Sequence, residues 1–427
     1  MVTIYSPEIS PRIDYVVNLI FKNILGLDFI ITNELNDLNG IVVNYSKEPL
    51  VIDSYQIYPS GFLEVNNWDF LNHMPVKSDK SYFFSQSIGD HNFDLLSTVF
   101  FLVSRMEEYN NENYDKHHRF NSKDSILVKL NLEKKPIIDI WCYELLKNLN
   151  DKFKSSIKSK KSFYQICTFD IDNAYAFKHK SNKRYFGSFL KDLFLLRSYK
   201  LKQRFKLIIG SDKDPYDNYD YIQSFCETNN LKSIFFFLIG DYGRMDRNIN
   251  FKNPALIKLI KSLLNNSKIG IHPSYNSFNN LATLKKEISR LNDITLDSII
   301  MSRFHYLRFS LPESYQILIE AGIKEDYSMG YVDRIGFRAG TCTPFYFYDL
   351  NIEKTSELKI IPFAYMDGVL NDKLKYSPKL AKKIINEVKE NVKQVNGQFS
   401  SVWHNESLSN QDRWKGWREV FESTWLD

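Results

Sequence analysis

The sequence predicts an α/β fold in which a parallel sheet curls into a distorted or partial (β/α) barrel, preceded by a smaller α+β domain. Two observations predict it. Apolar, strand-like runs alternate with helical patterns from about residue 163 onwards, as in parallel α/β sheets. A lysine- and serine-rich stretch at 151–162 has no apolar periodicity and separates this half from the residues before it. We therefore expect two domains, at 1–155 and 163–427.

The expected N-terminal domain opens with short strand-like pieces and continues with helices. Residues 40–45 and 50–55 have the composition of strands. Residues 93–109 carry apolar side chains at helical spacing, and residues 136–153 form a second helical pattern that starts near Asp139. The pattern indicates a fold for this half but no role.

Strands and helices alternate through the second half. Asn253 is a cap for one expected helix, with Pro254 in its first turn, and Ser310 and Glu313 form a capping box that opens another. The expected strands cover 165–172, 233–240, 268–274, 335–340, 358–367 and 399–405, and the expected helices cover 253–266, 281–294 and 310–322. Reactive residues in such folds collect at the carboxyl ends of the strands.

Composition excludes several classes of protein. The 56 basic and 51 acidic residues give a net charge of +5, which is too small an excess to indicate a nucleic-acid partner. The four cysteines contain no CxxC pair, so we expect neither a disulfide framework nor a thiolate zinc site, and we expect a cytoplasmic protein with reduced thiols. We expect no signal peptide, and no apolar run is long enough to span a bilayer.

The ends of five predicted strands carry an acid, a histidine or an arginine. Asp170 and Asp172 end the first strand, and their spacing puts both carboxylates on one face. Neighbouring carboxylates repel unless water, a basic group or a metal neutralises them. The other four strand ends carry His272, Arg338, Asp367 and His404. One such residue would be uninformative, but five strand ends at the same rim predict a site.

Asp172 and His272 are a reasonable start on a divalent-metal site. Zinc accepts carboxylate oxygen and neutral imidazole together, and a catalytic site keeps one position for water. A second aspartate beside that water would take its proton, and a histidine on the opposite side would protonate the leaving group. Taken alone, His272 and His404 are as readily structural histidines, and His305 lies in an aromatic stretch where core packing is the default.

These residues match a family motif by motif. The segment from about Phe163 onwards resembles the polysaccharide deacetylases of carbohydrate esterase family 4, whose first motif is T-F-D-D-G or a D-x-D variant and reads Thr168 to Asp172 here. The resemblance implies a deacetylase-type barrel, with Asp170 as catalytic base and Asp172 as metal ligand. In the second motif, H-[S/T]-x-x-H, His272 matches the first histidine. Asn276 replaces the second, so that Asn276 or His305 would complete the metal shell.

The remaining motifs follow in the family's order. The resemblance implies that Arg338 orients the base, with Gly340 where the family has proline, and that His404 is the catalytic acid. Asp367 stands where the family carries an aspartate that tunes that histidine. The first 150 residues resemble the uncharacterised N-terminal domain of one bacterial branch of these proteins.

The implied activity is a metal-dependent hydrolase, with zinc as the favoured metal, that removes N- or O-linked acetyl groups from a carbohydrate or glycan precursor. An alternative is a catalytically weakened relative that binds glycan or a partner in polysaccharide synthesis, which Asn276 favours. A third reading is hydrolysis of another carbon–nitrogen bond in a non-sugar substrate. The basic, amphipathic insert at 182–210 is either a surface helix pair, a lid, or a contact for an anionic glycan or a membrane surface. The oligomeric state is not predicted.

Overall fold

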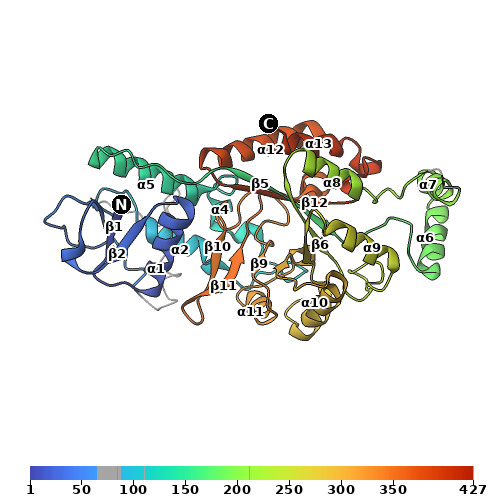
Figure 1. Cartoon of the computed structure of the whole chain (residues 1–427), viewed down its shortest axis with the longest axis horizontal. Helices are drawn as coiled ribbons and strands as arrows, with labels where there is room; N and C mark the ends of the chain where they lie inside the picture. Colours follow the sequence, from blue (N-terminus) through green and yellow to red (C-terminus); the bar gives the residue numbers. More distant parts are fainter. Residues whose placement is uncertain (65–83, 85–87, 110, 211, 427) are drawn as a thin grey trace.

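The computed structural model of the chain describes residues 1–64, 84, 88–109, 111–210 and 212–426. Two sheets dominate it (Figure 1). A four-stranded sheet lies near the N-terminus, and an eight-stranded sheet occupies the rest of the chain, curled into a half-barrel. The fold is therefore mixed α/β, as the sequence predicts.

The N-terminal sheet is parallel throughout its described strands, in the order β2-β1-β3-β4. Its strands are β1 (Val2–Tyr5), β2 (Phe29–Thr32), β3 (Ile41–Asn44) and β4 (Tyr55–Gln56), and its principal helices are α1 (Pro11–Val17), α2 (Leu95–Val103), α3 (Met106–Tyr109) and α5 (Ile137–Phe153). The expected helix at 136–153 is confirmed. The expected strand at 50–55 is wrong, because only its last residue enters β4.

The eight-stranded sheet has the order β10-β11-β9-β8-β7-β6-β5-β12. All neighbouring pairs are parallel except β10 and β11. The strands are β5 (Tyr164–Ile171), β6 (Lys232–Phe237), β7 (Lys268–Ile271), β8 (Met301–Ser302), β9 (Glu325–Asp326), β10 (Phe345–Asp349), β11 (Lys354–Ile360) and β12 (Gln398–His404). Four of them, β5, β6, β7 and β12, were expected from the sequence, and the strand expected at 358–367 overlaps only the end of β11.

Helices cover the outside of this sheet (Figure 1). They are α8 (Tyr219–Thr228), α9 (Pro254–Leu263), α10 (Leu281–Thr295), α11 (Glu313–Glu320), α12 (Pro378–Gln394) and α13 (Trp417–Trp425). The side chain of Asn253 accepts a hydrogen bond from the Ala255 amide, which confirms the expected cap of α9. Within the described ranges, every helix is too short or too polar to cross a membrane.

Side chains alternate between the two faces of β5. Cys167, Phe169 and Ile171 belong to the large apolar cluster beneath the helices. Ile166 packs on the inner face of the half-barrel, in a small separate cluster with residues of β6, β8 and neighbouring loops. Because the period is two, Asp170 faces the same interior as Ile166.

One expected strand, 335–340, is instead a series of turns. Gly336 and Gly340 both adopt positive φ angles, of 133° and 72°, that a strand does not contain. The Phe337 amide donates to the carbonyl of Glu133, so this loop is held by the N-terminal half and not by a neighbouring strand. The expected strand at 358–367 ends early, at Ile360, shortly before Pro362.

The N-terminal region and the half-barrel share one apolar core. A single cluster of buried residues runs through both sheets and their helices. Polar contacts add to it, since Arg12 donates to both carboxylate oxygens of Glu353 and the Ile138 amide donates to the carbonyl of Gly340. The two parts therefore pack as one body.

Residues 182–210 form a helical hairpin of α6 (Asn182–Phe194) and α7 (Ser198–Ile208). It lies at one end of the long axis of the molecule, opposite the N-terminal sheet (Figure 1).

Candidate active site

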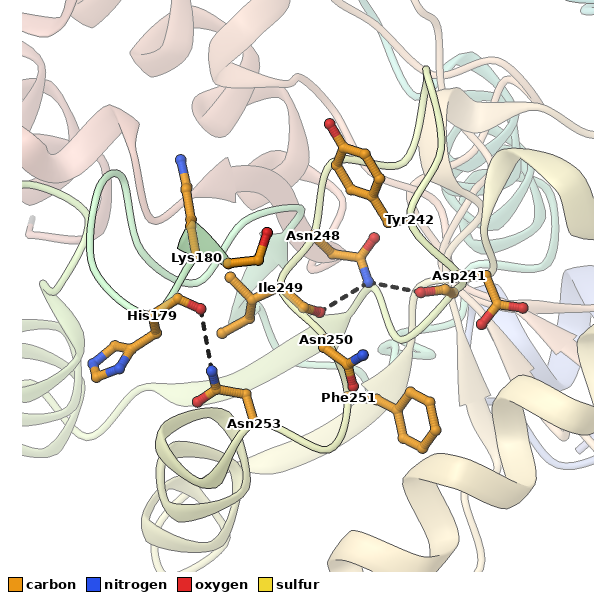
Figure 2. Close-up of a pocket in the computed structure, with 11 residues that line it drawn as sticks. His179, Lys180, Asp241, Tyr242, Asn248, Ile249, Asn250, Phe251 and Asn253 are labelled. Atoms are coloured by element: carbon orange, nitrogen blue, oxygen red, sulfur yellow. Dashed lines mark hydrogen bonds between the residues drawn. The ribbon is translucent and has the colours of Figure 1, made fainter. Parts of the chain in front are cut away.

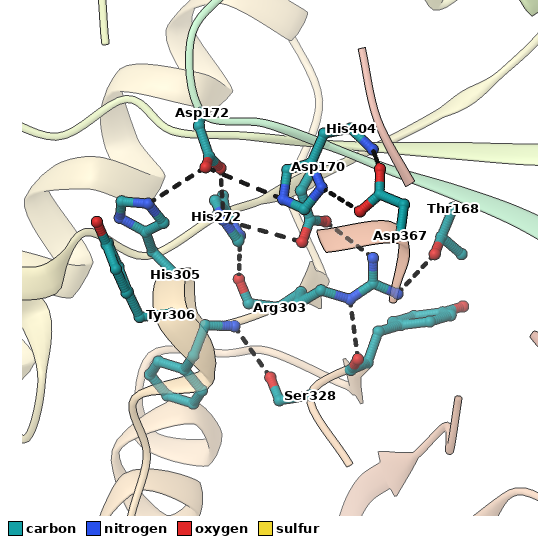
Figure 3. Close-up of polar contacts among 12 residues, drawn as sticks. Thr168, Asp170, Asp172, His272, Arg303, His305, Tyr306, Ser328, Asp367 and His404 are labelled. Atoms are coloured by element: carbon teal, nitrogen blue, oxygen red, sulfur yellow. Dashed lines mark hydrogen bonds and ion pairs between the residues drawn. The ribbon is translucent and has the colours of Figure 1, made fainter. Parts of the chain in front are cut away.

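Two neighbouring strands deliver the first acidic and imidazole groups of the site. Asp170 lies at the end of β5 and Asp172 follows it. Strand β12 pairs with β5 in parallel so that His404 lies opposite Asp170. On the other side, His272 follows β7, which pairs with β6 next to β5. These strand ends bring Asp170, Asp172, His272 and His404 together (Figure 3).

Asp172, His272 and His305 form a cluster that could hold a metal ion. Each offers one ligand atom, and these atoms lie within 4.8 Å of one another. The Nε2 atom of His272 lies 3.2 Å from Asp172 Oδ1, and the Nε2 atom of His305 lies 3.5 Å from Asp172 Oδ2. One carboxylate and two imidazole nitrogens are a donor set that suits zinc and related divalent ions.

Both histidines are fixed through their other ring nitrogen. His272 Nδ1 lies 2.6 Å from the carbonyl oxygen of Arg303, and His305 Nδ1 lies 2.8 Å from Asp246 Oδ1. Asp246 is itself held, because the Tyr275 amide donates to the same oxygen. Such outer partners set the tautomer that turns Nε2 toward a metal. Asp246 carried no recognisable motif in the sequence.

The electrostatics of the cluster fit a cation. Asp172 is partly exposed to the cavity, but its Oδ1 atom, which lies toward His272 Nε2, is buried. Burial would raise the pKa of Asp172, yet the charge of His305 and hydrogen bonds from His272 and His305 hold it well below its ordinary value. Burial would lower the pKa of His305, but the charge of Asp172, with hydrogen bonds to Asp172 and Asp246, raises it to about 9. A buried carboxylate oxygen facing two imidazoles is the pattern a metal ion completes.

Asp170 is held by Arg303. Its Oδ1 atom accepts from Arg303 Nη1 at 2.8 Å, and Arg303 also donates to Thr168 Oγ1 and to the carbonyl of Tyr327. Both members of the pair are buried. The other oxygen, Oδ2, lies 4.0 Å from His272 Nε2. One carboxylate oxygen of Asp170 is thereby bound to the Arg303 guanidinium, while the other faces the ligand cluster at His272 (Figure 3).

His404 and Asp367 form a histidine–carboxylate dyad, which lies on the other side of Asp172 from His305 (Figure 3). His404 Nδ1 lies 2.7 Å from Asp367 Oδ1, and the His404 amide donates to Oδ2 of the same carboxylate. Its Nε2 atom lies 4.0 Å from Asp172 Oδ2. Burial would lower the pKa of His404, but the charge and hydrogen bond of Asp367, with the charges of Asp172 and Asp170, raise it well above its ordinary value.

Arg338 lies elsewhere. The sequence placed it beside Asp170, but its Nε and Nη2 atoms donate to the two carboxylate oxygens of Glu108, a residue of the N-terminal region. Arg303 occupies the place beside Asp170 that was expected for Arg338. The reason is that residues 335–340 do not run as a strand into the rim. Arg303 directly follows β8, whose neighbour β7 leads into His272, so the parallel pairing brings it to the rim.

Asn276 is outside the ligand cluster. It lies in the short 3-10 helix Tyr275–Ser277 and is exposed, with its side-chain nitrogen beside Gly243. His305, the other candidate, has its ring beside that of His272 with centroids 5.0 Å apart.

The cluster and the dyad open into one cavity of about 550 Å³. Part of its wall comes from the N-terminal region, through Lys116, His117 and Arg119. Arg119 Nη1 donates to the carbonyl of Tyr306, the residue after His305, and His117 Nδ1 lies 3.0 Å from the Tyr275 hydroxyl. No sequence pattern pointed to this wall, because it depends on contacts across nearly two hundred residues.

A second cavity, of about 370 Å³, lies beside α9 (Figure 2). Asn248 donates to the carbonyls of Gly240 and Ile249, and Asn253 donates to the carbonyl of His179. These amides are engaged with backbone, and the cavity lacks a cluster of acids and imidazoles within the described chain. His179 is exposed there.

Comparison with known proteins gives one family match, to DUF7033, a family of unknown function, over residues 2–154. No curated protein matches the chain. Among solved structures, the chain is similar to a Mycobacterium smegmatis protein provisionally named a polysaccharide deacetylase, with 12% identity over 64% of this chain and 86% of that one and a TM-score of 0.40. It is also similar to PuuE allantoinase, with 11% identity over 62% of this chain and 84% of that one and a TM-score of 0.37. A third similar structure is a CE4 family pseudoenzyme from Bacillus anthracis, with 10% identity over 62% of this chain and 61% of that one and a TM-score of 0.30.

Proposed function

We propose that the chain is a metal-dependent hydrolase that removes N- or O-linked acetyl groups from a carbohydrate or glycan precursor. The observation that carries the proposal is the arrangement in one cavity of a three-residue ligand cluster, an arginine-held carboxylate and a carboxylate-held imidazole. Acyl hydrolysis requires a base for water, an acid for the leaving group and stabilisation of the oxyanion.

Asp172, His272 and His305 would hold the metal. A divalent ion bound there supplies Lewis acidity, which polarises the acetyl carbonyl and lowers the pKa of water. The fit rests on the buried Oδ1 of Asp172, 3.2 Å from His272 Nε2, and on the two imidazoles fixed through their Nδ1 atoms.

Asp170 is the proposed base. Arg303 fixes its plane through Oδ1, which leaves Oδ2 to accept the proton of the attacking water. Since the pair is buried, the carboxylate has little freedom to rotate away.

His404 is the proposed acid. Asp367 holds its Nδ1 atom, so Nε2 carries the proton that would pass to the departing amine or alkoxide. The charge and hydrogen bond of Asp367 favour the protonated imidazole, which suits this role. The raised pKa also means that Asp367 stabilises the charged form before the proton is given up.

The alternative of a weakened, glycan-binding relative rested on Asn276. His305 offers an imidazole to the cluster, so the amide at 276 removes no ligand from it. We therefore favour the enzyme, with its base and acid both present. Hydrolysis of a non-sugar amide would use the same residues and differs only in what fills the cavity.

Metal content and acetate release test the proposal together. Purified wild type should hold about one divalent ion per chain, and His272→Ala and His305→Ala should lose it, because each removes one of three protein ligands. Asn276→Ala is the matched control and should retain the ion.

Acetate release from N- and O-acetylated saccharides should fall by on the order of 100-fold or more in Asp170→Asn and His404→Ala, with metal still bound. A wild type that binds no divalent metal would refute the hydrolase and leave the binding protein as the better reading. Metal loss in Asn276→Ala but not in His305→Ala would refute the ligand assignment.

A further inference from the structure

The α6–α7 hairpin exposes an unusual number of large apolar side chains. They are Phe186, Leu190, Leu193, Phe194, Leu195, Leu196, Tyr199, Phe205 and Ile209. The turn between the helices is the most open part, with Phe194 87% and Leu196 85% exposed. Scattered exposed apolar residues are ordinary, but a contiguous group at the tip of a projecting element marks a contact surface.

The hairpin is nevertheless built to keep its shape. Arg204 of α7 is buried and donates to Asp192 of α6, 2.9 Å away, and to Ser188. The same guanidinium lies over the rings of Phe177 and Tyr185, 4.5 and 5.1 Å from their centroids. Arg204, Asp192 and Ser188 therefore hold the two helices together and against Phe177 in the loop after β5, while the apolar side chains listed above remain outside.

Basic residues surround the apolar tip. The stretch 182–210 has eight lysines and arginines and one acidic residue, Asp192, which the arginines engage. Lys191 and Lys202 are exposed, and Arg197 is exposed next to the tip. Two copies of such a surface would repel each other, whereas an anionic lipid surface would attract it.

We propose that the α6–α7 hairpin binds the surface of an anionic membrane, with Phe194 and Leu196 at its tip inserted among the lipids and the flanking lysines at the headgroups. An amphipathic element of this kind buries its apolar face about 5 to 10 Å into the headgroup region, and each basic residue at the surface adds about fivefold in affinity. The hairpin projects from one end of the molecule, where a flat surface can reach it (Figure 1).

The hairpin is also connected to the rim of the site. Gln203 of α7 donates to Gln411, and Lys200 and Gln203 line a small cavity together with Trp414. Trp414 also lines the cavity that contains Asp170 and His404. Docking through the hairpin would therefore hold the mouth of the site close to the bilayer, although the docking itself does not depend on the proposed hydrolysis.

Flotation of the full chain with vesicles tests the docking. Vesicles with about one quarter phosphatidylglycerol in phosphatidylcholine are compared with phosphatidylcholine alone. Wild type should float with the anionic vesicles. The double variant Phe194→Ser with Leu196→Ser, and the double variant Lys191→Ser with Lys202→Ser, should each lower the partition coefficient by more than about tenfold.

The matched control is Leu296→Ser with Ile352→Ser, which removes two exposed apolar side chains outside the hairpin and should float like wild type. Equal urea midpoints for all variants show that each is folded. The proposal is overturned if wild type does not float with anionic vesicles, or if Phe194→Ser with Leu196→Ser floats like wild type. If wild type does not float and is a dimer that this variant converts to a monomer, the apolar tip is a contact between two copies of the chain and not a membrane contact. Asp170→Asn should float normally, so a failure of acetate release leaves this result intact.

Discussion

Replacing Arg338 with methionine is expected to weaken the contact between the N-terminal region and the half-barrel while the chemistry at Asp170 survives. Glu108 is buried, and Arg338 gives it two hydrogen bonds, one at 2.9 Å to Oε1 and one to Oε2. Arg105 gives a third, at 2.8 Å to Oε1. Burial would raise the pKa of Glu108, but the charges and hydrogen bonds of the two arginines hold it below its ordinary value.

The loss of unfolding free energy follows from the Glu108 carboxylate, which stays buried when Arg338 is removed. Removing one partner of a buried ion pair costs about 3 to 5 kcal/mol, because the other charge stays buried without compensation. Arg105 remains in place, so we expect the lower figure, about 3 kcal/mol. With a urea dependence of about 3 kcal/mol per molar, the unfolding midpoint should fall by about 1 M.

The assay pairs urea unfolding, followed by tryptophan fluorescence, with metal content and acetate release. Arg338→Met should lower the midpoint and leave the metal and the turnover number unchanged. Arg303→Met should lower the turnover number by on the order of 100-fold, because Asp170 loses its fixed orientation. Arg334→Met, in the same loop beside Asp333, is the control and should change neither. The reasoning fails if Arg338→Met keeps the wild-type midpoint and loses turnover.

Three further changes test other contacts. Asp246→Asn should weaken metal affinity about 10- to 100-fold in a chelator competition, since it removes the charge behind His305; unchanged affinity would contradict the assignment of this outer partner. Burial raises the pKa of Glu287 from 4.5 to about 7, so between these values the folded state binds a proton that the unfolded state has released, and stability falls as pH rises through 7. Glu287→Gln should therefore be more stable than wild type at pH 8, by on the order of 3 kcal/mol, and similar to it below pH 4.5; parallel stability curves across this range would argue against a buried, protonated Glu287. Gly336→Ala should destabilise the chain by more than about 2 kcal/mol, because its Cβ would lie 2.2 Å from the Glu133 carbonyl oxygen at a φ of 133°; a wild-type urea midpoint would mean that the two parts do not meet there.

The four strands that the sequence predicted, β5, β6, β7 and β12, have four to eight residues each and are buried along most of their length, as parallel strands covered on both faces are. Strands β8 and β9 have two residues each, which is too short for any periodicity. Residues 335–340 resemble a strand in sequence, but Gly336 and Gly340 adopt positive φ angles in turns. The backbone of these turns hydrogen-bonds to Glu133 and Ile138 of the N-terminal region.

The site divides in the same way. Asp170, Asp172, His272 and His404 each end a readable strand, and the fold brings them together. Arg303 directly follows β8, a strand too short for the sequence to reveal, so the arginine at 338 was predicted in its place. Asp246 and the wall at 116–119 act through contacts between loops, for which a single sequence has no signal.

The pairing of β12 with β5 has a consequence for synthesis of the chain. His404 lies opposite Asp170 in the register, and more than two hundred residues are translated between the two strands. Until β12 arrives, one edge of β5 exposes unpaired backbone beside an apolar sequence, the state in which nascent proteins associate wrongly. A chaperone that covers this edge until β12 is made should therefore raise the yield of folded chain more than added stability in the finished protein does.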